Sequence, residues 1–128
     1  MPKVQQLTVT CENRPGTLAH LAKTLGDAKV NIVALHTETS GTEGRVRLIV
    51  DNVNKARKAL GNAGLSFSEE PVLHVELPDV SGALGAFAGK LAAKDINITA
   101  AYATAGKKAK KANMVLAVSD LDKAARIR

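Results

Sequence analysis

Side chains that could act as nucleophiles are few in this chain of 128 residues, and Cys11 is the single cysteine. A reactive thiol needs a basic partner within hydrogen-bond reach and access to solvent. Cys11 instead alternates in phase with Leu7 and Val9, which places it on the inward side of a predicted strand. We therefore expect a buried structural thiol rather than a nucleophile.

The three histidines and the adjacent acids also form no recognisable reactive set. No two His or Cys residues have a ligand spacing such as C-x-x-C or H-x-x-x-H, so the sequence predicts no metal site. Glu69 and Glu70 are neighbours in a predicted extended segment, where successive side chains point to opposite sides, and this makes them a poor acid/base pair. We predict that the chain is not an enzyme and uses no cofactor.

Positive charge suggests a second kind of chemistry, the binding of phosphates. The sequence has 18 basic and 12 acidic residues, a net charge of +6, and part of the excess lies in the run from Lys107 to Lys111. A lysine hairpin can hold nucleic acid nonspecifically, although a solvated hairpin tip explains the same run. Tryptophan is absent and only three residues are aromatic, so stacking on bases is not expected.

The composition also indicates the cellular compartment of the protein. A single cysteine cannot form an internal disulfide, the N-terminus has no apolar leader segment, and no window approaches the roughly 20 apolar residues of a membrane span. We expect a cytoplasmic protein without a membrane partner.

The elements that would position any site repeat along the chain. An offset of 66 residues places Leu7 on Leu73, Gly16 on Gly82, and the segment Val30-Asn31-Ile32 on Ile96-Asn97-Ile98. A repeat of this kind predicts two similar structural units. We therefore predict one domain over residues 1–70 and a second over residues 71–128.

Each copy has the pattern of an α+β fold. In the first, alternating residues predict strands and an i, i+3, i+4, i+7 stripe of Leu18, Leu21, Ala22 and Leu25 predicts a helix. The order is strand 7–11, helix 18–25, strands 30–37 and 45–50, helix 54–60 and strand 65–69, a ferredoxin-like βαββαβ unit.

The second copy is shorter. It is predicted to contain strand 72–77, helix 82–93, strands 96–103 and 113–118, and a short helix from Leu121. By homology with the first copy its closing strand would lie at roughly 133–138, past Arg128. The backbone of residues 72–77 would then be exposed unless another chain or copy covers it, which suggests dimerisation or strand exchange. A truncated chain, or a second half with only three strands, is the alternative.

The glycine-containing turn before the first helix and the Asn-Ile pair at the second strand resemble those of tandem ACT domains, small regulatory modules that bind amino acids. The first copy, with Cys11-Glu12-Asn13-Arg14-Pro15-Gly16-Thr17-Leu18 and Asn31-Ile32, is similar to the serine-sensing ACT domain of D-3-phosphoglycerate dehydrogenases. The resemblance implies a small amino acid held by Asn13 and Asn31. Cys11 stands where that family has a histidine.

The residues of this turn suit such a ligand. An Asn amide offers both a donor and an acceptor, and the free N–H groups near Gly16, Thr17 and Leu18 favour a carboxylate. Gly16 leaves room for a ligand, and Pro15 fixes φ at the helix entry. The alternative is that Asn13 and Gly16 form only a helix cap and turn.

The second copy keeps less of the pattern. Its turn is Asp79-Val80-Ser81-Gly82, and Asn97 matches Asn31. A carboxylate at Asp79 would repel a ligand carboxylate and accept an ammonium, and Asp79 would serve equally well as a helix N-cap. We predict a weaker second site at Asp79, Gly82 and Asn97.

Together these features predict a noncatalytic regulatory module that binds a small amino acid and assembles as a homodimer or a larger homo-oligomer. Two alternatives remain open. One is a nucleic-acid-associated regulator that uses the Lys107–Lys111 hairpin, and the other is a structural oligomerisation module without a ligand.

Overall fold

The computed structural model describes residues 3–104 and 110–127, which form six antiparallel strands and four helices. They divide into two compact units. We call Gln5–Glu70 the N-terminal unit, and Met1–Val4 together with Pro71–Arg128 the C-terminal unit. The predicted α+β class is confirmed. None of the helices in these described ranges is long and apolar enough to cross a membrane.

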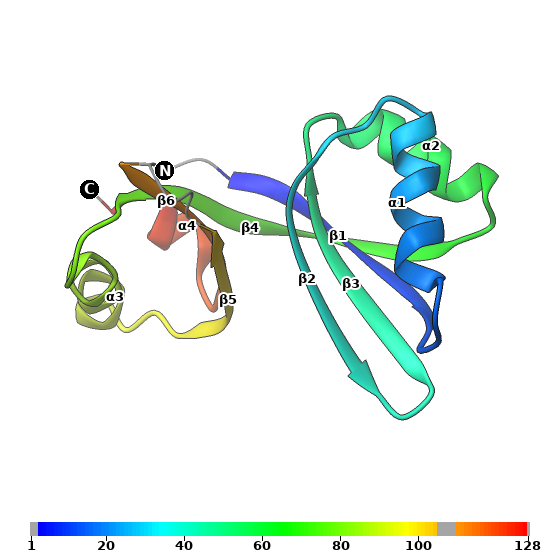
Figure 1. Cartoon of the computed structure of the whole chain (residues 1–128). Coiled ribbons are helices and arrows are strands. Elements are labelled where there is room, and N and C mark those ends of the chain that lie inside the picture. The colour runs from blue at the N-terminus through cyan, green and yellow to red at the C-terminus, as the bar shows by residue number, and fades with distance from the viewer. Residues whose placement is uncertain (1–2, 105–109, 128) are drawn as a thin grey trace. The chain divides into compact units, whose positions relative to one another are not determined.

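The N-terminal unit is a sheet with two helices on one face (Figure 1). Its strands are ordered β2-β3-β1-β4, and β3 runs antiparallel to both β1 and β2. The elements are β1 (Lys3–Glu12), α1 (Thr17–Asp27), β2 (Ile32–Ser40), β3 (Glu43–Val50), α2 (Val53–Asn62) and the first residues of β4 (Ser66–Pro78).

The core of this unit follows from the alternation along its strands. Leu7 and Val9 of β1 and Leu48 of β3 are fully or almost fully buried, and Leu21 and Leu25 of α1 pack on them. The predicted helical stripe is wrong at two positions, because Leu18 is 43% exposed and Ala22 is also exposed. The helix therefore buries a narrower face than the spacing indicates.

The C-terminal unit repeats the arrangement with fewer strands. Strand order is β4-β6-β5, with β6 antiparallel to both neighbours. Its core contains Leu73, Phe87, Leu91 and Leu116. The remaining elements are α3 (Ala83–Ala93), β5 (Ile98–Thr104), β6 (Lys111–Val118) and α4 (Leu121–Ala125).

The connection between the two predicted copies differs from expectation. Two separate strands joined near Pro71 were predicted, but β4 is one continuous strand from Ser66 to Pro78. Proline cannot donate a hydrogen bond to a neighbouring strand. Pro71 precedes the first β4–β6 pair, Leu73 with Leu116, so no hydrogen bond to β6 is lost at that position.

The edge of β4 that was expected to need another chain has a neighbour in the same chain. β1 lies beside β4 on the side opposite β6, and the first residues of β1, Lys3 and Val4, belong to the C-terminal unit. Lys3 Nζ also lies 2.9 Å from Asp122 Oδ1 at the start of α4. β1 therefore supplies a neighbour for part of this side of β4, and a partner chain beside residues 72–77 stays a prediction.

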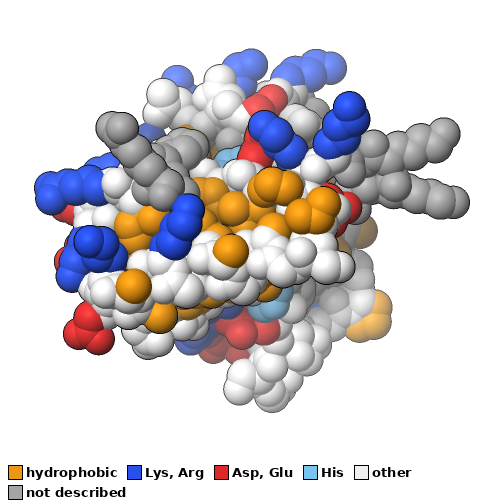
Figure 2. Space-filling model, turned by 90° about the vertical axis from the view of Figure 1, so that its left-hand side faces the viewer, with side chains coloured by type: hydrophobic (Ala, Val, Ile, Leu, Met, Phe, Trp, Pro, Cys, Tyr) orange, Lys and Arg blue, Asp and Glu red, His pale blue; other side chains and the backbone are white. Residues whose placement is uncertain are grey.

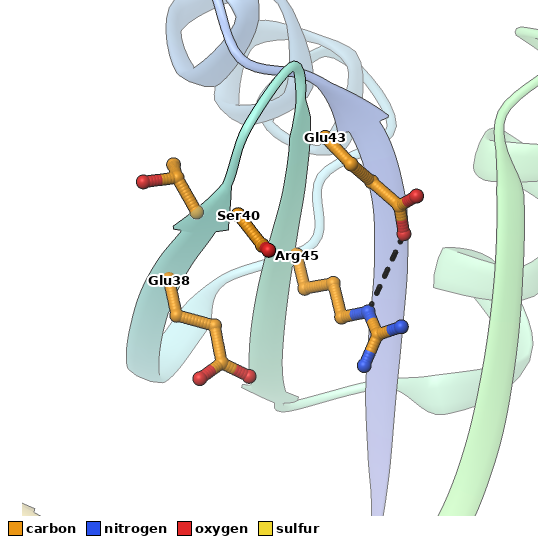
Figure 3. A pocket seen from close by; sticks show the side chains of 5 residues that line it. Glu38, Ser40, Glu43 and Arg45 are labelled. Atoms are coloured by element: carbon orange, nitrogen blue, oxygen red, sulfur yellow. Dashed lines mark ion pairs between the residues drawn. The ribbon is translucent and has the colours of Figure 1, made fainter.

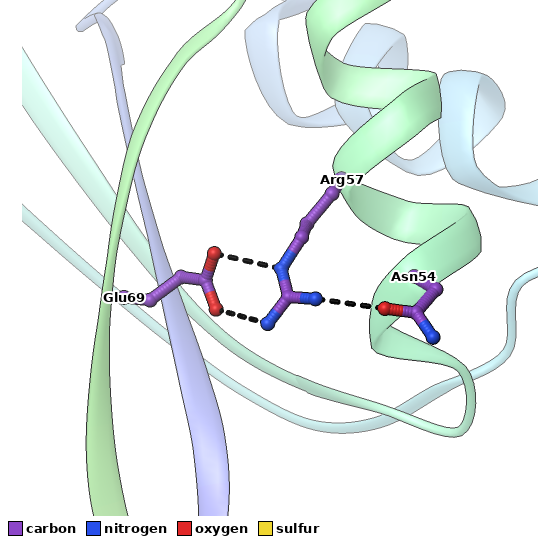
Figure 4. A network of polar contacts seen from close by, with 3 residues as sticks. All are labelled: Asn54, Arg57 and Glu69. Atoms are coloured by element: carbon purple, nitrogen blue, oxygen red, sulfur yellow. Dashed lines mark hydrogen bonds and ion pairs between the residues drawn. The ribbon is translucent and has the colours of Figure 1, made fainter.

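A polar network ties α2 to β4 within the N-terminal unit (Figure 4). The Arg57 guanidinium donates two parallel hydrogen bonds to the Glu69 carboxylate, at 2.8 and 2.7 Å, and a third to Asn54 Oδ1 at 2.7 Å. Paired bonds of this type fix geometry as well as charge. Glu69 is therefore engaged in a structural contact.

This network predicts a pH dependence of stability. The hydrogen bonds from Arg57 lower the pKa of the Glu69 carboxyl from its usual 4.5, so the pair stabilises the folded state at neutral pH, and that contribution disappears as pH falls through the lowered pKa. In urea denaturation, Glu69→Gln should be less stable than the parent at pH 7 and approach it in acid. Asn54→Ala keeps the ion pair and should retain the dependence; an equal deficit of Glu69→Gln at both pH values would contradict the assignment.

Candidate functional site

A pocket of about 390 Å³ lies at the turn between β1 and α1. We call it the turn pocket. It is formed by a continuous stretch of chain around the helix start together with one residue that precedes β4. The lining residues are Cys11, Glu12, Arg14, Pro15, Gly16, Thr17, His20 and Leu65.

No side chain caps the start of α1 at this pocket, and of the first-turn N–H groups that of Thr17 donates to Arg14 O at 3.4 Å. Gly16 is the N-cap residue, with φ of 89°, and no side chain there accepts a hydrogen bond from the first turn. At the start of α2, by contrast, Asn52 Oδ1 accepts from the Lys55 N–H at 3.1 Å. Gly16 is thus the cap residue, as the structural alternative expects, whereas the Asn13 side chain does not cap α1. Uncapped N–H groups at a helix start favour a negatively charged ligand group.

Asn13 has a different task from the one that the turn motif suggests. Its Nδ2 donates to Gly41 O at 3.0 Å, and its backbone N–H donates to Thr42 O at 2.8 Å. Both contacts hold the turn against the β2–β3 hairpin. Asn13 does not line the turn pocket but fixes the backbone that does.

Asn31 lies at the opposite end of the same sheet. Its N–H donates to Asp51 Oδ1 at 2.9 Å. The β1–β3 register pairs Glu12 with Glu43, and the β2–β3 register pairs Ile32 with Val50. Seven residues of β3 at roughly 3.4 Å each separate these ends by about 24 Å. Asn13 and Asn31 of one unit therefore do not meet at one small ligand, and Ile32 packs against the core instead.

The charges at the turn pocket are paired and exposed. Arg14 Nε lies 3.0 Å from Glu12 Oε2.

Cys11 is half-buried, and its thiol lies 3.7 Å from Gly44 O. Burial raises the pKa of the Cys11 thiol from its usual 9.0, which keeps it protonated at neutral pH. Cys11 therefore contributes a neutral wall.

Three lining residues of the turn pocket were not predicted as site residues: Glu12, His20 and Leu65. His20 was among the three histidines that form no recognisable reactive set in the sequence. The sequence feature that could have identified His20 as a lining residue is its position four residues after Gly16, since residues i and i+4 share a helix face. No group of three or more His, Cys, Asp or Glu side chains in the described ranges could hold a metal ion.

A second hollow, of about 310 Å³, lies at the β2–β3 hairpin (Figure 3). Its lining is Glu38, Thr39, Ser40, Glu43 and Arg45. Arg45 Nε is 3.5 Å from Glu43 Oε1, while Glu38 pairs with Arg47 at 2.6 Å. This pocket was not predicted from the sequence. The opposing charges of the register partners Glu38 and Arg45 were the available signal.

The C-terminal unit has a pocket of about 300 Å³ at the corresponding turn. Asp79 lines it, but Asp79 is not the helix cap, because Gly82 with φ of 87° is the N-cap and no side chain caps α3. Asn97 lies elsewhere and donates from its backbone to Ser119 Oγ at 2.9 Å. The other lining residues are mainly apolar: Leu77, Pro78, Val80, Ala83, Leu84, Ala103, Thr104, Ala112 and Met114.

The predicted lysine hairpin is only partly visible. Lys107 and Lys108 lie outside the described residues. Of the remainder, Lys111 begins β6 and its Nζ is 3.9 Å from Glu76 Oε2. This distance makes Lys111 part of a cross-strand ion pair between β6 and β4.

Comparison with known proteins assigns the fold that surrounds the turn pocket. Residues 5–60 match the model of the ACT domain. The chain therefore contains an ACT domain, and the matched residues begin in β1 and end in α2. No curated protein matches the sequence.

Solved structures with the same fold cover nearly the whole chain. Protein BT0572 from Bacteroides thetaiotaomicron is 30% identical, with a TM-score of 0.90 over 96% of this chain and 84% of that one. The regulatory subunit of aspartate kinase from Thermus thermophilus is 12% identical, with a TM-score of 0.70 over 98% and 94% of the two chains. The corresponding subunit from Thermus flavus is 14% identical, with a TM-score of 0.61 over 88% and 80%.

Proposed function

We propose that this protein is a noncatalytic regulatory module that binds a small amino acid in the turn pocket. The observation that carries the proposal is the uncapped start of α1 beside the Glu12–Arg14 pair. The similarity in fold to a regulatory subunit of aspartate kinase supports a regulatory role rather than a catalytic one.

The turn pocket offers a complement to each charged group of an amino acid. The ligand carboxylate would face the first-turn N–H groups of α1 and the Arg14 guanidinium, where the helix end carries partial positive charge. The ammonium would face the Glu12 carboxylate. Thr17 and His20 add further polar groups, and Pro15 and Leu65 give an apolar wall for a short side chain. A volume of about 390 Å³ limits the ligand to a small molecule.

We further propose that the C-terminal unit is a second ACT-like copy, with domains over residues 1–70 and 71–128. Among the described residues, its pocket is lined by Asp79 but by neither an Arg nor a His, which supports a weaker site there. The likeness of the first copy to serine-sensing domains makes serine the first ligand to test.

A homodimer would allow Asn31 to contribute to the proposed amino-acid site. Because Asn31 lies at the far end of its own sheet, it can contribute to a ligand at the turn pocket only from another copy. The edge strand β2 supports such an assembly, because its Val33 and Leu35 side chains are 40% and 42% exposed. An exposed apolar edge strand is a frequent site of pairing between chains.

A thermal-shift screen of the common amino acids tests the ligand proposal. A ligand that binds only the folded state adds about 2.7 kcal/mol of stability at 100 times its Kd, so the Tm should rise by several degrees for at least one amino acid. Arg14→Gln should reduce this rise by removing the carboxylate contact. Lys55→Gln removes an exposed cation of the same unit that does not line the turn pocket, and should leave the rise unchanged.

Two results would count against the proposal. One is the absence of any shift with every amino acid at millimolar concentration. The other is a shift that both Arg14→Gln and Lys55→Gln reduce equally, which would indicate a general effect of charge rather than a site.

A further inference from the structure

The C-terminal unit exposes hydrophobic side chains, and Figure 2 shows a group of them on the side of the molecule that carries this unit. The two most exposed large hydrophobic residues among those that the structure describes are Val80, at 65%, and Leu84, at 51%. Both line the hollow of about 300 Å³ at the start of α3, which we call the apolar pocket. Hydrophobic side chains that border a hollow can surround the carbon skeleton of a ligand.

The apolar pocket occupies the same place in its unit as the turn pocket does, but its lining differs. The backbone at the two helix starts is similar, with φ of 89° at Gly16 and 87° at Gly82. Four polar residues that line the turn pocket have apolar counterparts 66 positions later in the sequence. The pairs are Glu12 and Pro78, Arg14 and Val80, Thr17 and Ala83, and His20 and Ala86. A ligand that suits the turn pocket is therefore not expected to suit the apolar pocket.

Small side chains on the neighbouring strands help to create the hollow. In the strand register, Ala112 of β6 is the partner of Leu77 of β4, and Ala103 of β5 is the partner of Met114 of β6. All four residues line the apolar pocket, and Met114 also belongs to the buried core of the unit. An alanine beside a larger side chain leaves space that a longer residue would fill. The volume of about 300 Å³ is at the lower end of the range for small-molecule sites.

Asp79 is the one charged residue among the described residues that line the apolar pocket. Its backbone N–H donates to Lys110 O at 2.9 Å, which holds Asp79 at the end of β4. In the part of the chain that the structure describes, Asp79 takes part in no ion pair, and Lys111 lies 3.9 Å from Glu76 instead. Helix capping does not account for Asp79 either, because no side chain caps α3. A free carboxylate beside an apolar hollow attracts a cation that carries an apolar group.

We propose that the apolar pocket binds a small aliphatic ammonium compound, either a simple amine or an amino acid with a branched aliphatic side chain. The ammonium would pair with the Asp79 carboxylate, and the aliphatic group would contact Val80, Leu84 and Met114. This deepens the regulatory function proposed above, on which it rests for the equivalence of the two units. The turn pocket has Arg14 for a ligand carboxylate, whereas the apolar pocket has no cation among its described lining residues. The chain would then respond to two chemically different small molecules.

The test is a titration of the full chain with isobutylamine, leucine and isovalerate in turn, followed by the amide NMR signals at constant ionic strength. The three probes share one isobutyl group and differ in the charged groups that it carries. Isobutylamine or leucine should bind at millimolar concentration, with the largest shifts at Val80, Leu84 and Met114. Isovalerate, whose only charged group is a carboxylate, should bind about tenfold more weakly or not at all. Tighter binding of leucine than of isobutylamine would identify an amino-acid site, and the reverse an amine site.

Two variants test the contacts, each with a matched control. Asp79→Asn should weaken isobutylamine binding by about tenfold, because it removes the charge that pairs with the ammonium. Asp95→Asn removes an exposed carboxylate of the same unit that does not line the apolar pocket, and should change the affinity by less than about twofold. Leu84→Ser should weaken the binding of the same probe because it removes an apolar wall, and Leu18→Ser, at the matched position of α1, should not.

Absence of shifts with both ammonium probes, equal binding of isovalerate and isobutylamine, or equal weakening by Asp79→Asn and Asp95→Asn would overturn the proposal. Reduced self-association of Leu84→Ser in sedimentation, without binding of any probe, would overturn it in favour of a protein contact. Failure of this proposal is distinguishable from failure of the function proposed for the turn pocket. Isobutylamine shifts confined to the C-terminal unit would support the proposal even if no amino acid raised the Tm. A serine-induced rise in Tm without isobutylamine or leucine shifts would overturn this proposal alone.

Discussion

Replacing Leu25 with alanine is expected to lower the free energy of unfolding by about 2–5 kcal/mol, as is typical of a buried leucine. Leu25 is fully buried in the core that joins α1 to the sheet. Its backbone oxygen also accepts hydrogen bonds from Ala28 at 3.2 Å and from Val30 at 3.0 Å, where the helix ends. Loss of the side chain would leave a cavity beneath the same helix whose first turn forms the turn pocket.

Leu18→Ala in the same helix is the matched control, since it removes the same atoms from a side chain that is 43% exposed. We expect a loss of about 1 kcal/mol or less, because much of that side chain already contacts water. Urea denaturation of the full chain measures both variants. Equal losses for Leu18→Ala and Leu25→Ala would show that α1 does not pack on the sheet through Leu25.

The sequence predicted the elements best where burial is one-sided. Leu7 and Val9 alternate with threonines because one face of β1 packs on the helices, and the helix and strand orders of both units follow from such patterns. Patterns of this kind report which residues are buried. They do not report how many neighbours a strand has, so the continuation of β4 into the second unit, with β1 on one side and β6 on the other, was not predictable from them.

The continuous strand β4 shows a second reason why the sequence did not predict the whole fold. Glu69, Glu70 and Pro71 have the composition of a linker, yet each is in the strand. Glu69 is held by Arg57, and Glu70 accepts from Gln6 Nε2 at 2.8 Å. These partners are 12 and 64 residues away in sequence, and a local composition rule cannot include contacts of that range.

The candidate site was predictable as a segment but not as a set of contacts. Cys11 and residues 13–18 were expected to form one site, and all of them except Asn13 and Leu18 line the turn pocket. Asn13 and Asn31 have the same side chain, but one holds a hairpin and the other lies about 24 Å away along the sheet. An Asn in a turn motif indicates a hydrogen bond without indicating whether its partner is a ligand or the chain.

The four helices are of two kinds, which differ in whether a side chain caps their first turn. α2 and α4 begin with side-chain caps, in which Asn52 and Asp120 accept from backbone N–H groups at 3.1 and 3.0 Å. α1 and α3 begin instead at Gly16 and Gly82, both with φ near +90° and without a side-chain cap. The two helix starts without a side-chain cap adjoin the turn pocket of the N-terminal unit and the pocket at the corresponding turn of the C-terminal unit. The two glycines thus leave both of these helix starts without a side-chain cap.

Gly16→Ala is therefore expected to lower both the stability and the affinity for the amino acid. With φ of 89° a residue that has a Cβ is strained, at a cost of about 1–2 kcal/mol. No atom lies within 4 Å of the Cβ that would be added, so the cost comes from the backbone and not from crowding. Relaxation of that strain would turn the first-turn N–H groups away from the turn pocket, and the ligand-induced rise in Tm should shrink.

Gly26→Ala is the control, because Gly26 lies in α1, is equally exposed, and also has no atom within 4 Å of the added Cβ. At a negative φ, alanine favours the helix, so this variant should gain about 0.5–1 kcal/mol and keep the full ligand-induced shift. The two changes add the same methyl group ten residues apart, and only the one at the uncapped helix start should affect the ligand. If Gly16→Ala lost stability but retained an undiminished Tm rise, the first-turn N–H groups would not be part of the amino-acid site.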